Sequence, residues 1–250
     1  MELNYDLIGI RSLFSFSSKK LLLNRRWAIV ALMAGLVAVV MMYVASEGNG
    51  TIDEGSTLIN ALILSFLLPI MSLIYGASMI RNEIDDRSIT QVITSPMDRR
   101  ASYLGYYLSL TAVLIVMLVV IELVGWASYF LTIGVDQEAL QLLLSYALVL
   151  TIGAFVYSSF FLALGVFFRQ PIYLGLLYAF VWEGFVGSLP GAIGQLTISY
   201  YLKVIGASLI PYGSISEVSG DPVIAALILT ALTIFLFAIG AFGFREKEVP

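Results

Sequence analysis

Long apolar blocks alternate with short polar segments along the chain. A helix that crosses a bilayer needs about 20 predominantly apolar residues, because the hydrocarbon core is about 30 Å thick. Blocks that satisfy or approach this length cover residues 27–45, 58–80, 104–130, 140–168, 172–189 and 223–244. Pro69 interrupts the second block, and neighbouring groups can satisfy the carbonyl that a proline frees. The pattern predicts an all-α membrane protein with six transmembrane helices in a single transmembrane domain over residues 1–250.

Basic residues are distributed unevenly among the predicted loops. If the N-terminus is cytoplasmic, every Lys and Arg residue except Lys203 falls on the cytoplasmic side. The opposite loops are acidic and carry Glu47, Asp53, Glu54, Asp136, Glu138, Glu217 and Asp221. Because cytoplasmic loops of membrane proteins carry the excess of Lys and Arg, the sequence predicts an even number of spans with both termini cytoplasmic.

Residues 1–26 precede the first apolar block and form a separate feature. Bulky apolar residues such as Leu13 and Phe14 are interleaved there with basic residues such as Arg11 and Lys19. Basic and apolar faces on one short helix suit a segment that lies in the headgroup plane. We expect an interfacial amphipathic helix, and the alternative is a solvated tail with an anchor before the first span.

The composition excludes several kinds of chemistry. Hydrophobic residues make up 60% of the chain and charged residues 12%, about half the charged fraction of a soluble domain. The chain has no Cys and no His, so thiol nucleophiles, Cys/His zinc sites and Ser–His pairs are absent. It also lacks a G-x-x-x-x-G-K-[ST] loop for nucleotide phosphates and a G-x-S-x-G elbow. We therefore expect a protein that is not an enzyme, with no catalytic residues, no metal site and no bound cofactor.

The segment of residues 81–100 joins the second and third blocks on the predicted cytoplasmic side. Asp85 or Asp86 can cap a short helix, on which Ile89, Val92 and Ile93 form one apolar stripe. Pro96 ends that helix. The segment is either an amphipathic helix that docks on a cytoplasmic partner or a plain interfacial loop with charged anchors.

Two glutamates, Glu122 and Glu183, fall inside predicted spans. A charged, unpaired carboxylate costs a few kcal/mol there, so each side chain should face protein or a water-filled cavity. Either residue belongs to a substrate or proton path, or it is a neutral or hydrogen-bonded group that ties helices together. Glu183 is the stronger candidate for a functional role, since a Gly- and Pro-rich segment follows it.

That segment, residues 184–221, is rich in apolar residues for a solvated loop and includes Tyr200 and Tyr201. Short helices that dip back into the outer leaflet would account for this composition, provided that they pack on protein. We expect such re-entrant helices between the fifth and sixth spans. The alternative is a loop on the membrane surface with tyrosines at the interface.

One run of residues in the loop follows the order of a known family. It begins at Glu83 and continues through Ser88, Ile89, Val92, Ile93, Thr94, Ser95, Pro96 and Arg99. This order resembles the loop of ABC-2 type permeases, the export branch of the ATP-binding-cassette transporters. Arg87 stands where glycine is common and Tyr106 where lysine is common, departures that bear on the subfamily rather than on the family. Residues 182–190 with 200–202 also resemble the copper-enzyme-maturation branch.

The resemblance covers essentially the whole chain and implies a mechanism. Two copies of the permease, or one copy and a close relative, would pair in a prokaryotic cell (inner) membrane, and each would dock a cytoplasmic ABC ATPase that carries ATP and Mg. The segment from Asp86 to Thr94 would be the coupling helix, with Glu83 and Arg87 near the ATPase groove. The short outer helices, with Tyr200 and Tyr201, would form an outer gate.

Two other functions compete with an ATP-driven exporter. The first is an ion-coupled secondary transporter that uses Glu122 and Glu183 as proton or cation sites. The second is a membrane assembly subunit that transports nothing. The sequence identifies no substrate, and nothing in it indicates nucleic-acid binding.

Overall fold

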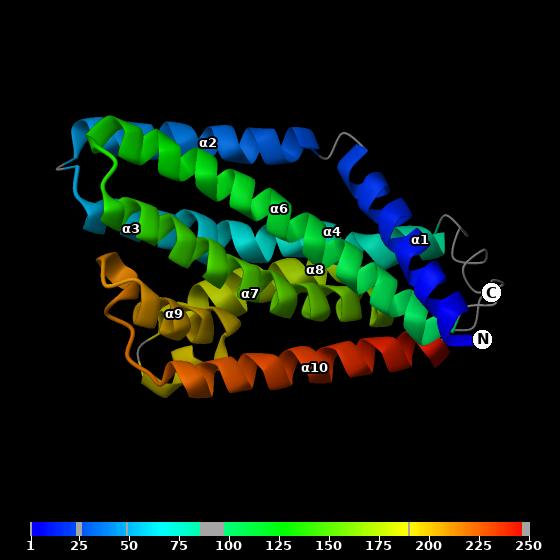
Figure 1. Cartoon of the computed structure of the whole chain (residues 1–250). Helices are drawn as coiled ribbons and strands as arrows, with labels where there is room; N and C mark the ends of the chain where they lie inside the picture. The colour runs from blue at the N-terminus through cyan, green and yellow to red at the C-terminus, as the bar shows by residue number, and fades with distance from the viewer. Residues whose placement is uncertain (1, 24–26, 49, 86–97, 190, 247–250) are drawn as a thin grey trace.

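The computed structural model describes residues 2–23, 27–48, 50–85, 98–189 and 191–246, and within these ranges the regular secondary structure is helical (Figure 1). The longer helices are α1 (Glu2–Leu23), α2 (Trp27–Glu47), α3 (Ile52–Ile59), α4 (Leu68–Asp85), α6 (Arg99–Ile133), α7 (Gln137–Phe167), α8 (Pro171–Leu177), α9 (Ile198–Leu209) and α10 (Pro222–Glu246). Short π-helical and 3₁₀ pieces join them: η1 (Asn60–Leu67), η2 (Tyr178–Phe185), η3 (Val186–Ser188), η4 (Gly191–Leu196) and η5 (Gly213–Ile215).

Among the described residues, five helical stretches are long and apolar enough to cross a membrane: Trp27–Glu47, Ile52–Ile80, Arg99–Ile133, Gln137–Phe167 and Pro222–Glu246. The chain is therefore an all-helical, multi-pass membrane protein. The fifth predicted span, residues 172–189, corresponds to the consecutive pieces α8, η2 and η3, which are not among the five. The count of six spans and the re-entrant placement of the outer helices stay predictions.

The second spanning stretch begins six residues before the predicted block, at Ile52. Thr51 is its N-cap, and the Thr51 side chain accepts a hydrogen bond of 3.3 Å from the Glu54 backbone N–H. Asp53 and Glu54 stand in the first turn, where acidic side chains favour the positive end of the helix dipole. The helix is π-wound over Asn60–Leu67, immediately before Pro69. The proline ring crowds the preceding turn, and a wider turn relieves that crowding.

The helices run side by side with α6 in a central position. Helix α6 packs against α1, α2, α7 and α10, and α7 packs against α4, α9 and α10. Helix α1 crosses one end of the bundle, where α6 begins and α10 ends, and α9 lies at the opposite end (Figure 1). We call these the basic end, which carries Arg11, Lys19, Arg99, Arg100 and Arg245, and the acidic end, which carries Glu47, Asp53, Asp136, Glu138, Glu217 and Asp221.

The core lies between α4, α6 and α7 and is rich in aromatic residues. Tyr75, Tyr129 and Tyr157 are fully buried. Only 28% of the most apolar window of α2 and 17% of that of α10 are buried, against 56% to 61% in the other three spanning stretches. Helices α2 and α10 therefore turn most of their apolar surface outward, toward lipid or a partner.

Helix α1 lies against the first half of α6. The Ser18 and Ser109 hydroxyls are 3.0 Å apart and share a hydrogen bond. A Cβ atom added at Gly105 would lie 3.0 Å from the Leu13 side chain, so the missing side chain lets α1 approach. The predicted interfacial helix is thus joined to the spanning helix that starts at Arg99.

We expect Gly240→Ala to destabilise the protein by about 1–3 kcal/mol, the usual cost of adding a methyl group to a packed core. The added Cβ would overlap the hydroxyl of Tyr103. Tyr103 is fully buried and packs on the rings of Phe237 and Phe244 at 5.3 Å and 5.8 Å, so it has no space to move. Thermal unfolding in detergent micelles measures the loss.

Gly35→Ala is the matched control for this prediction. Nothing lies within 4 Å of a Cβ atom at Gly35 on α2. The change should leave stability unaltered or raise it by up to about 1 kcal/mol, since alanine favours a helix more than glycine does. Equal unfolding temperatures for the two variants would contradict the packing of Tyr103 against α10.

Candidate functional site

The predicted coupling residues lie around the basic end of the bundle. Glu83 is part of the last turns of α4 (Leu68–Asp85), and α6 starts at Arg99 after its N-cap, Asp98. Six further predicted coupling residues lie outside the described part of the chain: Asp86, Arg87, Ile89, Val92, Ile93 and Pro96. The structure thus shows the two helices that flank the segment (Figure 1). Helix α4 ends at the basic end, and α6 begins there.

Glu183 caps the N-terminus of α9. Its carboxylate accepts hydrogen bonds from the backbone N–H groups of Ile198 at 3.0 Å and Ser199 at 3.1 Å. These are the first two residues of α9, and their N–H groups have no carbonyl partner within the helix. A carboxylate at this position also favours the positive end of the helix dipole. The side chain is 6% exposed, so these bonds replace water.

The π-helical winding of η2 supports this cap. The Tyr178 hydroxyl donates a 2.5 Å hydrogen bond to the Glu183 carboxylate five residues further along. In an α-helix, residues five apart point in different directions, whereas the wider π turn pairs position i with position i+5. Trp182, the residue before Glu183, adds a second bond, because its indole N–H donates to the Leu196 carbonyl at 3.1 Å. Two adjacent residues of η2 therefore hold the end of η4 and the start of α9.

Lys203 brings a cation to the same place. It lies on α9, and its burial lowers its pKa while the charge of Glu183 acts in the opposite direction. The sequence offered no cation within a span that could act on Glu183, and in the structure the cation whose charge acts on it comes from outside the spanning stretches.

Tyr200 and Tyr201 have a different setting from Glu183. The Tyr200 hydroxyl donates to the Ser219 carbonyl at 3.0 Å, which ties α9 to the segment before α10. The two rings meet edge to face, with centroids 5.3 Å apart. Both side chains are partly buried. Their observed contacts join the short helices of the acidic end to one another.

A dense set of hydrogen bonds, which we call the acidic-end latch, fastens residues 212–214 to α3 and η1. Ser56 donates to the Tyr212 carbonyl at 2.8 Å and Asn60 to the Ser214 hydroxyl at 3.0 Å. Asp53 accepts from the Gly213 N–H at 2.8 Å, and Thr57 accepts from the Ser214 N–H at 3.1 Å. The latch joins parts of the chain more than 150 residues apart.

The latch is braced from α7 and shaped by a glycine. The Tyr146 hydroxyl donates to the Ser56 carbonyl at 2.9 Å, and a hydrogen bond with Glu138 raises the pKa of the Tyr212 hydroxyl. Gly213 has a φ of 68°, which residues with a Cβ atom rarely adopt. A Cβ atom there would come within 2.8 Å of the Asp53 carbonyl and of the Thr57 hydroxyl.

The sequence carried a signal for the latch that was not recognised. The polar residues Asp53, Ser56, Thr57 and Asn60 are spaced at i, i+3, i+4 and i+7, which places them on one face of a helix. Three of them fall at the start of, or just before, the second apolar block. A polar stripe at the N-terminal end of a spanning helix indicates a polar partner, which here is the loop around Gly213.

Glu122 lies apart from this network. It is fully buried in α6, and neither carboxyl oxygen has a hydrogen-bond partner among the described residues. Glu183, in contrast, accepts hydrogen bonds from the Tyr178 hydroxyl and from the start of α9. No hydrogen bond among the described residues joins the two glutamates. An isolated buried carboxyl group is far less costly in its neutral, protonated form.

Within the described residues, no group of three acidic side chains is placed to hold a metal ion. The arrangement at the acidic end is instead a set of hydrogen bonds that hold separate helices together. It can hold the ends of α3, η2 and α9 in one geometry, and a second geometry would require these bonds to break together.

Comparison with protein families gives a match to a transporter family. The model of a family described as ABC-2 family transporter protein matches residues 20–183, which is well over half of the chain. The match starts within α1 and ends at Glu183. A search of curated proteins gives no match.

Removal of the Asp53 carboxylate should loosen the acidic-end latch. We expect Asp53→Ala to lower stability by about 1 kcal/mol, a typical value for one hydrogen bond at a partly exposed site. Asp53→Asn is the matched control, because it keeps the oxygen that accepts from Gly213. Limited proteolysis within residues 210–217 measures the opening, and equal cleavage of the alanine and asparagine variants would show that this bond does not hold the loop.

Loss of the Glu183 cap should free the start of α9. Loss of a capping side chain costs about 1–2 kcal/mol, so we expect Glu183→Ala to speed amide exchange at Ile198 and Ser199 roughly tenfold. Hydrogen–deuterium exchange followed by mass spectrometry of peptides over residues 196–205 reads this directly. Glu217→Ala, at an exposed acidic position of the same end, is the control, and unchanged exchange in both variants would refute the cap.

Proposed function

The chain belongs to the ABC-2 transporter family, and we propose that it is the permease subunit of an ATP-driven exporter whose ATPase is a separate cytoplasmic protein. The family match over residues 20–183 carries this proposal. The spanning helices support a role in moving a substrate across a membrane. The chain lacks a loop for nucleotide phosphates, so ATP and Mg would be bound by the partner.

Helix α6 is the element best suited to pass a movement of the ATPase to the other side of the membrane. It has 35 residues and is therefore about 50 Å long. It begins directly after the predicted coupling segment and packs on α1, α2, α7 and α10. A push on its first turn would thus reach the acidic end and most of the bundle.

Contacts at the basic end would make α6 and α10 move together. The Arg99 side chain donates to the Arg245 carbonyl at 2.8 Å, and Tyr103 packs on Phe237 and Phe244. The Ser18–Ser109 hydrogen bond adds α1 to the same unit. These contacts support a working unit of α1, α6 and α10 beside the docking segment.

At the acidic end, the acidic-end latch and the Glu183 cap would hold the closed state of an outer gate. Opening would move α9 away from η2 and the loop around Gly213 away from α3, and the cap joins the first pair while the latch joins the second. Glu122 is enclosed by protein and would meet a substrate only after α6 and α7 separate. In this proposal a second copy, or a close relative, would complete the path.

Charge reversal near the coupling segment should weaken ATPase docking. We expect Glu83→Lys to lower recovery of the ATPase in a detergent pull-down several-fold, because charged contacts fix the register of an interface. Glu47→Lys makes the same change at the acidic end and should leave recovery intact. Membrane insertion, measured as the yield of protein extracted from the membrane, should be equal for the two variants.

The same preparation separates the exporter from its rivals. ATP hydrolysis that rises on assembly, with transport that stops when the ATPase is inactivated, would support the proposal. Transport that survives without the ATPase and collapses with an ion gradient would instead establish a secondary transporter. Full recovery of the ATPase with Glu83→Lys would exclude this end of α4 from the docking surface.

A further inference from the structure

Glu122 places a carboxyl group deep inside the bundle. Its side chain is fully buried, and neither carboxyl oxygen has a hydrogen-bond partner among the described residues. It stands about 16 Å before the end of α6 (Arg99–Ile133), at a rise of about 1.5 Å per residue. This depth is within the apolar block of residues 104–130, where water is not at hand to solvate a charge.

Glu183 shows what a charged carboxylate needs in the interior. It accepts hydrogen bonds from the Tyr178 hydroxyl at 2.5 Å and from the backbone N–H groups of Ile198 and Ser199 at 3.0 Å and 3.1 Å. It also stands at the positive end of the α9 dipole. Glu122 has none of these donors, and a buried carboxylate without them is far costlier than a neutral acid. The contrast favours a charged Glu183 and a neutral Glu122.

The helices around α6 bring no compensating charge to the depth of Glu122. Helices α2, α3, α4, α7 and α10 pack against α6, and the charged side chains of their described residues lie in their first or last two turns. Helix α1 crosses the basic end, where α6 begins (Figure 1). The chain has no His and no Cys, so the other titratable side chains of these helices are tyrosines. The buried ones include Tyr75 on α4 and Tyr146 on α7, and tyrosine is neutral below about pH 10.

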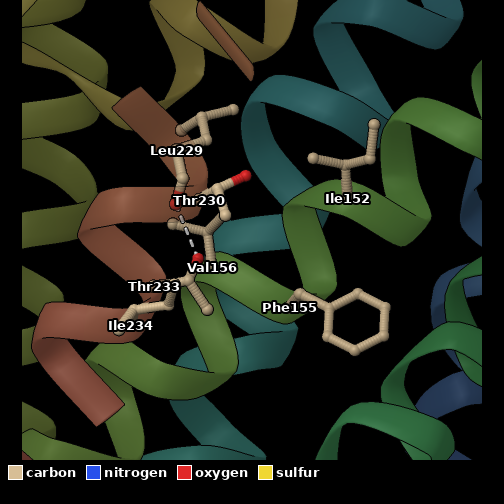
Figure 2. A pocket seen from close by; sticks show the side chains of 7 residues that line it. All are labelled: Ile152, Phe155, Val156, Leu229, Thr230, Thr233 and Ile234. Atoms are coloured by element: carbon tan, nitrogen blue, oxygen red, sulfur yellow. Dashed lines mark hydrogen bonds between the residues drawn. The ribbon is translucent and has the colours of Figure 1, made fainter. Parts of the chain in front are cut away.

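Packing separates Glu122 from water in the observed arrangement. One turn further along α6, a Cβ atom added at Gly125 would lie 2.7 Å from the Val37 side chain on α2. The Trp126 indole donates to the Ala139 carbonyl at 2.8 Å and so ties α6 to α7. The groove between α7 and α10 (Figure 2) is lined by residues of those two helices and by none from α6. Water would therefore reach Glu122 when α6 moves away from α7.

We propose that Glu122 is a proton-binding site, which is occupied while α6 and α7 are packed together and is emptied when they separate. On separation the O–H bond of the acid breaks, its electron pair stays on the carboxylate, and the proton passes to a water molecule. The carboxylate is then solvated, as a glutamate in water is above about pH 4.3. The proposal rests on the proposed function only in that this separation is the movement assumed for transport.

The coupling has a definite sign. The packed state binds one proton more than the separated state, so a rise in pH favours the separated state. The ratio of separated to packed molecules should increase by up to about tenfold per pH unit above the range in which a solvated carboxyl group ionises. Acid should hold α6 and α7 together.

Infrared spectroscopy of the intact protein in phospholipid vesicles tests whether the site is occupied at neutral pH. The C=O band of a neutral carboxylic acid is separate from the bands of a carboxylate. We expect this band to be lost in Glu122→Gln and kept in Glu183→Gln. A band that persists in full in Glu122→Gln would overturn the proposal.

A second measurement needs no variant and applies if Glu122→Gln is not recovered folded. Dicyclohexylcarbodiimide attacks protonated carboxyl groups in apolar surroundings, and mass spectrometry locates the adduct. We expect Glu122 to be labelled several-fold more than Glu183 in the unaltered protein. Equal labelling of the two glutamates would overturn the difference in charge.

Spin labels test the coupling to helix movement. The chain has no cysteine, so Leu131→Cys on α6 and Leu144→Cys on α7, both at exposed positions, give a specific pair for pulsed electron paramagnetic resonance. We expect the population with the longer distance to grow as the pH rises, and to become independent of pH in Glu122→Gln but not in Glu183→Gln. No pH response in the parent pair, or the same response in Glu122→Gln, would refute the coupling. Neither labels nor spectra need the ATPase, so the pull-down with Glu83→Lys still decides the proposed function by itself.

Discussion

Every backbone N–H and carbonyl group inside a bilayer must find its partner within the protein. The spanning stretches meet this demand as helices, and the demand becomes acute where helices end close to the membrane. At the acidic end, α3 and α9 begin with backbone N–H groups that no helical carbonyl can satisfy. The Thr51 side chain accepts a hydrogen bond from such a group of α3, and the side chains of Thr197 and Glu183 accept hydrogen bonds from those of α9. The position of Glu183 inside a predicted span follows from this requirement, because the helix that it caps lies against it.

The polar groups of the acidic end therefore gather where helices start, and these are also the places where distant segments meet. The acidic-end latch connects α3 with the loop before α10, and the Glu183 cap connects η2 with α9. Both are closed by bonds to backbone groups, so their geometry depends on the position of whole helices. The ABC-2 family match makes this arrangement relevant to transport, because the proposed mechanism moves helices relative to one another.

The sequence predicted what depends on local composition and missed what depends on tertiary contact. The apolar blocks at 27–45 and 104–130 indicated spanning helices because length and hydropathy suffice for that inference. The early start of the helix at Ile52 was missed because the polar residues around Asp53 are typical of a loop. Their helical conformation depends on a tertiary partner, the segment around Gly213, which the local sequence does not indicate. Lys203 could not be paired with Glu183 in advance, because they lie on different helices whose packing the sequence does not specify. The family resemblance, in contrast, rested on the order of residues in one loop, and the match over residues 20–183 confirms it.

Lys203 has a consequence for the electric field outside the protein. It is the one basic residue of the described chain that lies on α9, and it is partly buried beside Glu183. The exposed carboxylates of the acidic end, including Glu47, Asp136, Glu217 and Asp221, therefore face the solvent with little compensation. Their combined potential concentrates cations near this end of the bundle and repels anions, over a range of about 10 Å at 0.1 M salt.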